Sequence, residues 1–363
     1  MLPYLITFSL SILSYKFALK PLTKGLRFLC FLTCVLPPAI LAGLRDDVLG
    51  RDWYGYGVVI WSLANHVENF GQLMSLYPAI EPGYKVFNYA ISFISSDCHV
   101  FFFFHQLLLV SIAFFVAYRY RNNRFSEVIM LFYFLYVFNT SMTIIRQSIA
   151  LMLCMLAYAL WDSRNRIGAY VFTGLAGVCH VSAVFSIAVF VLTMCKKILQ
   201  KHQILIMIAV IVMTYYMVDS FSVILTKLID MNIFSWHYIG YADQVGDVAI
   251  HKTDVAFQIA IIIMTVCYPS KKKDAEVCSR IFFLALSAIV LNMFGNITDI
   301  AFRVAHYFVI PIAILVPRIS TISKDNRRIC LIFLLLLTVR FLYFAYSNGA
   351  ENTVPYASKL LGI

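Results

Sequence analysis

Long apolar runs that end in basic residues are the feature of this sequence that most constrains its fold. The runs are about 17 to 22 residues long and continuously apolar, which is the length a helix needs to cross a bilayer. They do not alternate between apolar and polar residues, as the strands of a membrane barrel would. Hydrophobic residues make up 61% of the chain and charged residues 13%, too apolar a balance for a water-soluble domain. The sequence therefore predicts an all-α, polytopic integral membrane protein.

Basic residues after every second run set the predicted topology. The first run, residues 2–19, is interpreted as a span rather than a cleaved signal, and Lys20, Lys24 and Arg27 place the loop after it in the cytoplasm. Continued to the end, the pattern predicts about twelve spans in a single domain over residues 1–363, with both termini outside. The inner loops and span ends then hold 20 of the 29 Lys and Arg residues but 5 of the 18 Asp and Glu residues.

The net charge of +11 does not indicate nucleic-acid binding, because the basic residues lie in short loops between spans. Most of the nine cysteines lie within apolar runs and show no metal-binding spacing, so neither a metal site nor a cofactor is expected. Cys98 and Cys179, both predicted near the outer face, are the one pair considered for a disulfide. The histidines and aspartates from His237 to His251 also lack ligand spacing and are interpreted as a polar loop.

The outer segment of residues 45–99 departs from the span pattern. Polar residues such as Asn65, His66 and Glu68 interrupt its first apolar part, which predicts an amphipathic helix at the membrane interface. Residues 84–95 are apolar over only about twelve positions, too short for a span and suited to a re-entrant or half-buried segment.

Charged residues on the outer side are not explained by topology and mark the candidate site. The stretch GLRDDVLGRDWY at 43–54 is the first cluster, and it combines two arginines with three aspartates. Further clusters surround Glu81, Arg146, His180 and Arg303. If these helices pack together, four arginines meet near one outer cavity: Arg45, Arg51, Arg146 and Arg303.

Each cluster also has a purely structural interpretation. Arg45 with the two aspartates after it suits a solvated span end, and Arg303 suits a helix pair with Asp299. His180 suits a histidine bonded to a backbone carbonyl. Arg146 is harder to explain, because a guanidinium one turn inside a span needs a partner or an aqueous cavity. The aromatic residues suit either an interfacial belt or stacking on sugar rings: Trp53, Tyr54, Tyr56, Trp61 and Tyr84.

The sequence AGLRDDVLGRDWYGY at 42–56 resembles the G-R-x-x-x-G-x-D-x-x-Y element of EpsG-like polysaccharide polymerases, a branch of the Wzy type. Further similar elements follow in the same order along the chain: Glu81-Pro82, SMTIIRQSIA at 141–150, GVCHVSAV at 177–184, RVAHYF at 303–308 and Pro355-Tyr356. The chain departs from the family at Arg51, where a threonine or small residue usually precedes the aspartate.

The resemblance implies an enzyme that joins oligosaccharide repeat units carried on undecaprenyl diphosphate, with the lipid diphosphate as leaving group and no metal. It implies the bacterial cytoplasmic membrane, with the active site facing the periplasm or the outside. The implied partners are lipid-linked donor and acceptor glycans and membrane lipids, together with a flippase and a chain-length regulator of the same pathway.

Arginine binds phosphate bidentately, so the four outer arginines are the predicted diphosphate ligands. Asp52, Glu81 or His180 is the predicted general base. Residues expected to orient the sugars are Asp46, Tyr54, Tyr84, Gln147 and Tyr307.

Three other activities stay open at this point. A flippase for lipid-linked sugars would use similar residues, although we expect it to show repeat symmetry and midplane charges. A polysaccharide ligase has almost the same chemistry. A membrane O-acyltransferase needs a catalytic histidine with an acidic or polar partner, and none is evident for His180.

Overall fold

The computed structural model describes residues 1–46, 52–194, 205–214, 216, 227, 231, 252–267, 272–294, 299–319 and 327–362. Within these residues, the side chains of 53–54, 272–274, 299–300 and 348–351 are not described. The described chain is helical and contains no strand. It divides into two compact units, Met1–Val184 with Lys324–Ile363, and Phe185–Ser323.

Five of the described helices are long and apolar enough to cross a membrane. They are α2 (Lys24–Gly43), α6 (Cys98–Arg119), α15 (Lys272–Phe294), α16 (Asp299–Ile319) and α17 (Arg327–Asn352). Shorter apolar segments of 10 to 17 residues include α1 (Leu2–Ala18), α10 (Arg166–Cys179), Val181–Met194 and Leu205–Thr214. A further one, Glu127–Ser141, is formed by α7 (Glu127–Phe132), η2 (Tyr133–Val137) and α8 (Phe138–Ser141).

The prediction of a polytopic, all-helical membrane protein is confirmed by these helices. The number of twelve spans is not reproduced, because many of the apolar helices are shorter than a bilayer crossing requires. The remaining long helices are α9 (Ile145–Asp162) and α14 (Lys252–Cys267).

Short polar residues fix where several helices begin. The Thr23 side chain accepts a hydrogen bond from Leu26 N at the start of α2, and Asn165 accepts one from Gly168 N at the start of α10. Such N-caps satisfy backbone donors that have no partner within the helix. They place the helix starts in the polar loops that the hydropathy pattern indicates.

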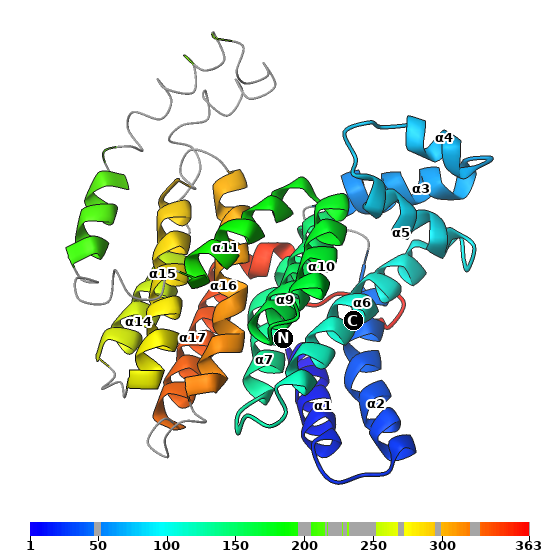
Figure 1. The fold of residues 1–363 in the computed structure, drawn as a ribbon. Helices are drawn as coiled ribbons and strands as arrows, with labels where there is room; N and C mark the ends of the chain where they lie inside the picture. Colours follow the sequence, from blue (N-terminus) through cyan, green and yellow to red (C-terminus); the bar gives the residue numbers. More distant parts are fainter. Residues whose placement is uncertain are drawn as a thin grey trace. The chain divides into compact units, whose positions relative to one another are not determined.

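Residues 53–92 form four short elements rather than a span. A π-helical turn, η1 (Trp53–Val58), leads into α3 (Val59–His66), followed by α4 (Phe70–Ser75) and α5 (Pro82–Ser92). Figure 1 shows α3, α4 and α5 together, away from the loop between α1 and α2. None of them is long enough to span a bilayer, and α5 packs against α3, α6 and α10.

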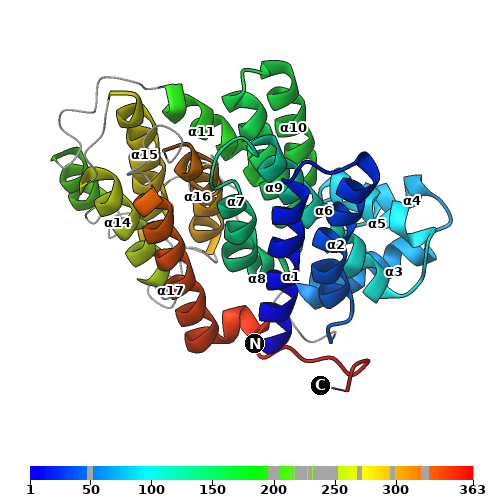
Figure 2. The ribbon, with the colours of Figure 1, turned by 90° about the horizontal axis from the view of Figure 1, so that it is seen from below.

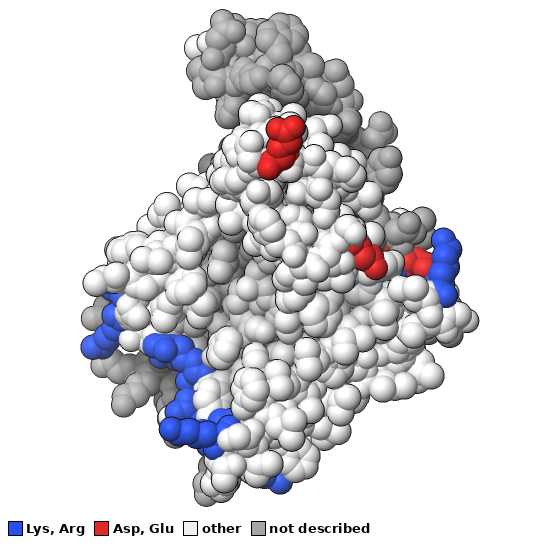
Figure 3. Space-filling model, turned by 90° about the vertical axis from the view of Figure 1, so that its right-hand side faces the viewer, with Lys and Arg blue, Asp and Glu red and all other residues white. Residues whose placement is uncertain are grey.

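One end of the first unit carries the basic loops. There Lys16 Nζ lies 3.5 Å from a Glu127 carboxylate oxygen, and Arg119 donates to Ser163 Oγ at 2.6 Å. These contacts tie the last turn of α1 to α7 and the end of α6 to the end of α9. Figure 3 shows a broad uncharged band across one face, with most of the visible Lys and Arg side chains below it, as expected for a lipid-facing surface.

The C-terminal tail, residues 353–362, folds over the opposite end of the first unit. Figure 2 shows it passing the start of α1 after leaving α17. Tyr4 Oη donates to Thr353 O at 2.5 Å, and Tyr356 Oη donates to Leu41 O at 2.9 Å. The tail backbone also pairs with Asp46, whose N–H donates to Ala357 O at 3.0 Å. The tail therefore joins the start of α1 to the end of α2.

Arg340, inside α17, had no explanation from the sequence. Its guanidinium lies over the ring of Tyr136 at 4.1 Å and over that of Phe344 at 4.7 Å. An arginine between two aromatic faces is stabilised by cation–π attraction, which is stronger away from water. Packing between α17 and η2 (Tyr133–Val137) thus explains a charge within an apolar helix.

In the second unit, α15 packs against both α14 and α16. Asn292 Nδ2 on α15 donates to Gln258 Oε1 on α14 at 2.9 Å, and both side chains are buried. Hydrogen bonds of this kind join helices within a membrane.

Candidate functional site

Glu81 is the centre of a charged cluster at the end of the first unit that lies away from the basic loops. Arg146 Nη1 donates to Glu81 Oε2 at 2.5 Å. The other carboxylate oxygen, Oε1, accepts from Val181 N at 3.4 Å and lies 3.9 Å from His180 Nε2. Three of the sequence-predicted site residues are therefore brought together from widely separated parts of the chain.

The three side chains are largely shielded yet reachable. Arg146 is 13% exposed, Glu81 15% and His180 17%. Partial burial strengthens charge–charge interactions relative to water, while the remaining exposure leaves a route for a ligand. Such a cluster can bind an anion and transfer a proton.

Glu81 is positioned by the first turn of α5. It occupies the N-cap position with Pro82 next to it, and its side chain makes no capping bond within the helix. A Cβ on Gly83 would lie 2.9 Å from Val178 O, so only glycine allows α5 to approach the end of α10 this closely. The close approach brings Glu81 beside His180.

Arg146 lies in the first turn of α9, which starts at Ile145. A cation is disfavoured there by the helix dipole, whereas an anion is favoured, so Arg146 needs a counter-charge. Glu81 supplies one. The helix N-terminus and the guanidinium together form a place for a negatively charged group.

Tyr56 supports the guanidinium of Arg146, which lies 3.8 Å from the centre of its ring. Tyr84 Oη donates to Tyr56 O at 2.8 Å and so holds the π-helical turn. Tyr84 is fully buried, and burial raises the pKa of its hydroxyl, which keeps it a neutral donor. In the structure Tyr84 positions Tyr56, and its predicted sugar contact stays a prediction.

Asp52 begins the same turn. Its backbone carbonyl accepts from Tyr56 N at 3.0 Å and from Gly57 N at 3.3 Å. The carboxylate of Asp52 acts electrostatically on the Tyr84 hydroxyl. Asp52 thus lies near Tyr84, whose hydroxyl holds the turn that carries Tyr56.

The ring of His180 is oriented by Ser182. Ser182 N donates to His180 Nδ1 at 3.2 Å, and Ser182 Oγ lies 2.7 Å from the same nitrogen. Because a backbone N–H donates to it, Nδ1 is the acceptor, and the neutral ring carries its proton on Nε2. That nitrogen is the one that faces Glu81.

Arg45 and Asp46 lie beneath the C-terminal tail. Arg45 is 1% exposed, and its guanidinium lies 4.7 Å from the ring centre of Phe102. Burial lowers the pKa of Arg45. Asp46 Oδ1 accepts from Lys359 N at 2.7 Å. Asp46 therefore helps to hold the tail, and the predicted roles of Arg45 at the diphosphate and of Asp46 at the sugars stay predictions.

The other predicted site residues lie elsewhere. Gln147 is buried next to Arg146 on α9. Arg303, half-buried, and Tyr307, buried, lie on α16 in the second unit, and their predicted roles stay predictions. Arg51 and the side chain of Tyr54 fall outside the described residues.

Two contributors to the site received no separate role in the sequence analysis, Tyr56 and Ser182. Tyr56 is one of the aromatic residues predicted to form an interfacial belt or to stack on sugar rings, and Ser182 lies in the GVCHVSAV element without a role of its own. The spacing of Ser182 two residues after a histidine at a helix end is the signal that indicates a side chain able to orient the ring.

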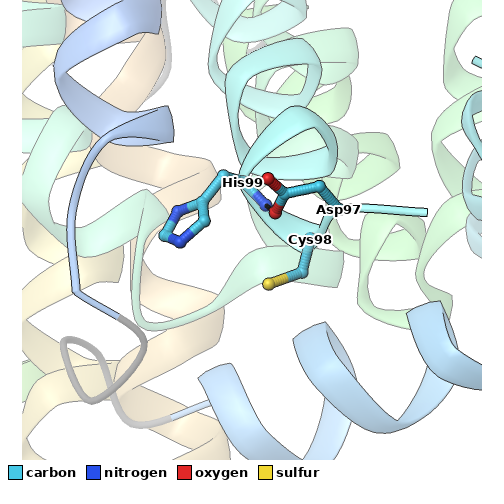
Figure 4. Close-up of side chains that lie close together, drawn as sticks. All are labelled: Asp97, Cys98 and His99. Atoms are coloured by element: carbon cyan, nitrogen blue, oxygen red, sulfur yellow. Dashed lines mark hydrogen bonds between the residues drawn. The ribbon is translucent and has the colours of Figure 1, made fainter. Parts of the chain in front are cut away.

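Asp97, Cys98 and His99 also lie close together at the start of α6 (Figure 4). Asp97 Oδ1 accepts from His99 N at 2.9 Å as the helix N-cap, and His99 Nδ1 donates to Gly43 O at 2.7 Å. These contacts cap α6 and join it to α2, so we assign the group a structural role. The disulfide considered between Cys98 and Cys179 is not formed.

A comparison with family models decides the family, since the EpsG family model matches residues 28–358, nearly the whole chain. The protein belongs to the EpsG family. No curated protein and no solved structure matches this EpsG-family chain. The match includes every residue of the Glu81 cluster and confirms the resemblance found in the sequence. Membership of the EpsG family indicates a membrane enzyme of the polysaccharide polymerase type.

Proposed function

We propose that this EpsG-family protein joins oligosaccharide repeat units carried on undecaprenyl diphosphate at the outer leaflet of the cytoplasmic membrane. The observation that carries the proposal is Arg146 at the N-terminus of α9, paired with Glu81 and next to His180. A fixed cation at a helix N-terminus suits the diphosphate of a leaving lipid, and a carboxylate beside it suits a general base.

The reaction then follows from these groups. The hydroxyl oxygen of the acceptor sugar forms a bond to the anomeric carbon of the donor, and the bond from that carbon to the diphosphate breaks. The electron pair leaves with the diphosphate, whose charge Arg146 stabilises. The hydroxyl proton passes to Glu81 or His180 and then to water. Arg51 and Arg303 stay proposed as further diphosphate ligands, and Tyr307 as a sugar contact.

The outer-leaflet assignment is supported by the two ends of the first unit. The basic loops that include Arg119 lie at the end where α6 and α9 meet, and loops rich in Lys and Arg face the cytoplasm. The Glu81 cluster lies at the start of α9, the opposite end of that helix. This arrangement supports the proposed outside location, where nucleotide sugars are absent and a lipid diphosphate is the available leaving group.

Replacement of Arg146 tests the proposal. Arg146→Ala should abolish polymer while single repeat units still reach the cell surface. Arg121→Ala is the matched control, because Arg121 is an exposed arginine stacked on Tyr118 at the basic end. Polymer of normal length from a stably inserted Arg146→Ala protein would refute the assignment.

The glycans of a deletion strain separate the remaining activities. Single repeat units at the surface indicate a polymerase. Lipid-linked units that accumulate inside the cell indicate a flippase, and free full-length polymer without its anchor indicates a ligase.

A further inference from the structure

Arg146, the arginine proposed to bind the diphosphate, is also the residue that binds Glu81. Arg146 uses Nη1 for the bond to Glu81, at 2.5 Å, and its planar face rests on Tyr56. A carboxylate bound to this arginine is not free to take a proton from an acceptor sugar. The two functions that the site needs, anion binding and proton transfer, therefore compete for the same pair of side chains.

We infer that the Glu81–Arg146 pair is a substrate-operated gate. The donor diphosphate replaces Glu81 at Arg146, and the released carboxylate turns to the His180 side, where it accepts the proton of the acceptor hydroxyl. This inference rests on the proposed function and adds a regulatory step to it, because the base becomes available only once the donor is bound.

The contacts of Arg146 favour replacement by a diphosphate. Arginine offers five N–H donors, yet the Glu81 contact uses one of them, and the buried Nε donates to no residue in the described part of the chain. A diphosphate carries more charge than one carboxylate and can bind a guanidinium through two parallel hydrogen bonds. The N-terminus of α9 adds to the attraction.

The contacts of Glu81 show where the released side chain goes. Its Oε1 accepts from Val181 N at 3.4 Å and lies 3.9 Å from His180 Nε2, so both contacts are long. Its side chain makes no capping bond within α5. In the gate, rotation of the Glu81 side chain brings the released carboxylate toward Val181 N and His180 Nε2. His180, with its proton held on Nε2, then donates to the carboxylate and orients it.

The bonds, electrons and proton of the gated reaction are those of the glycosyl transfer. The acceptor oxygen bonds to the anomeric carbon, the carbon–oxygen bond to the diphosphate breaks, and the electron pair stays on the diphosphate at Arg146. The acceptor proton moves to Glu81. When the lipid diphosphate leaves and the proton is lost to water, Glu81 returns to Arg146 and the gate closes.

Binding of a short probe, geranylgeranyl diphosphate, to the full-length protein in nanodiscs tests the gate. Glu81→Gln removes the competing charge, so we expect it to bind the probe about tenfold more tightly than the wild type, a change of about 1.4 kcal/mol, and to form no polymer. Glu81→Asp keeps the charge but shortens the side chain, and should bind the probe with intermediate affinity. Arg121→Ala, at the exposed basic end, is the control and should leave probe affinity unchanged, and Arg146→Ala should abolish binding.

The outcomes separate the gate from the function on which it rests. Binding that depends on Arg146 but is unchanged or weaker in both Glu81 variants overturns the gate and leaves the proposed function standing. Wild-type binding that Arg146→Ala does not reduce, or no binding at all, overturns the diphosphate site and the gate with it. Tighter binding combined with lost polymerisation in Glu81→Gln supports the gate.

Discussion

Arg146 and Glu81 are 65 residues apart in the chain, and Arg146 Nη1 donates to Glu81 Oε2 at 2.5 Å. Each lies at the N-terminal end of a helix, α9 for Arg146 and α5 for Glu81. Two helix starts therefore converge on one pair of opposite charges. His180, at the end of α10, approaches the same carboxylate. Predictions about the site and about the fold that holds it follow from these positions.

Arg146→Lys should reduce polymer formation by about 10- to 100-fold, whereas Arg146→Ala should abolish it. Lysine keeps a positive charge at the start of α9, but an ammonium neither binds a phosphate through two parallel bonds nor lies flat on Tyr56. The length distribution of surface glycans measures the effect. Arg121→Lys, at the basic end, should leave that distribution unchanged, and equal behaviour of the two lysine variants would contradict the planar recognition.

Ser182→Ala should slow polymerisation by about three- to tenfold, since it removes the hydroxyl 2.7 Å from His180 Nδ1 but keeps the backbone N–H donor. The loss should appear in the turnover rate rather than in probe affinity, because the ring and not the diphosphate ligand is disturbed. Ser75→Ala is the control, as that hydroxyl bonds to Gln72 O in its own exposed helix. A change in probe affinity with unchanged turnover would argue against an orienting role.

Gly83→Ala should abolish most polymerisation without altering any charged group of the site. Its new Cβ would lie 2.9 Å from Val178 O, so α5 must move away from α10, and Glu81 moves with it. We expect a loss of about 1–3 kcal/mol in stability as well. Gly174→Ala, on α10 with open space around its Cβ, is the control and should leave activity unchanged. Thermal unfolding in detergent and glycan length together check the prediction, which an active Gly83→Ala protein would contradict.

Tyr356→Phe should destabilise the protein by about 1 kcal/mol, because it removes the buried hydrogen bond from the tail to Leu41 O. Tyr346→Phe is the matched control, since Tyr346 is 92% exposed. Unfolding midpoints of the two variants, measured side by side, test whether the tail holds the first unit together. Equal midpoints would show that it does not.

Much of the fold was predictable because the hydropathy of a segment depends only on the residues of that segment. The observed α1, Leu2–Ala18, matches the predicted first span of residues 2–19 within one residue, and Lys20, Lys24 and Arg27 follow it as the topology rule requires. The predicted count of twelve spans is not reproduced among the described residues. Hydropathy identifies apolar runs, but it does not determine whether the helix that forms is long enough to cross a bilayer.

The candidate site was predictable in part. Unexplained charge in apolar surroundings singled out Arg146, Glu81 and His180, and the structure brings these three together. The same reasoning singled out Arg45, which instead lies buried against Phe102 under the C-terminal tail. The sequence around Arg45 and Arg146 does not distinguish their environments, because both residues lie near the end of a predicted span.

The sequence by itself determined that this is a helical membrane protein of the EpsG family and which polar residues require an explanation. The length of apolar runs, the charge of loops and the order of motifs are properties of short stretches of sequence, so they can be identified without a structure. Only the tertiary structure decided that Glu81 neutralises Arg146, that Ser182 orients His180, and that the tail covers Arg45. Those relationships join residues far apart in the chain or depend on side-chain geometry, which arises only when the helices pack.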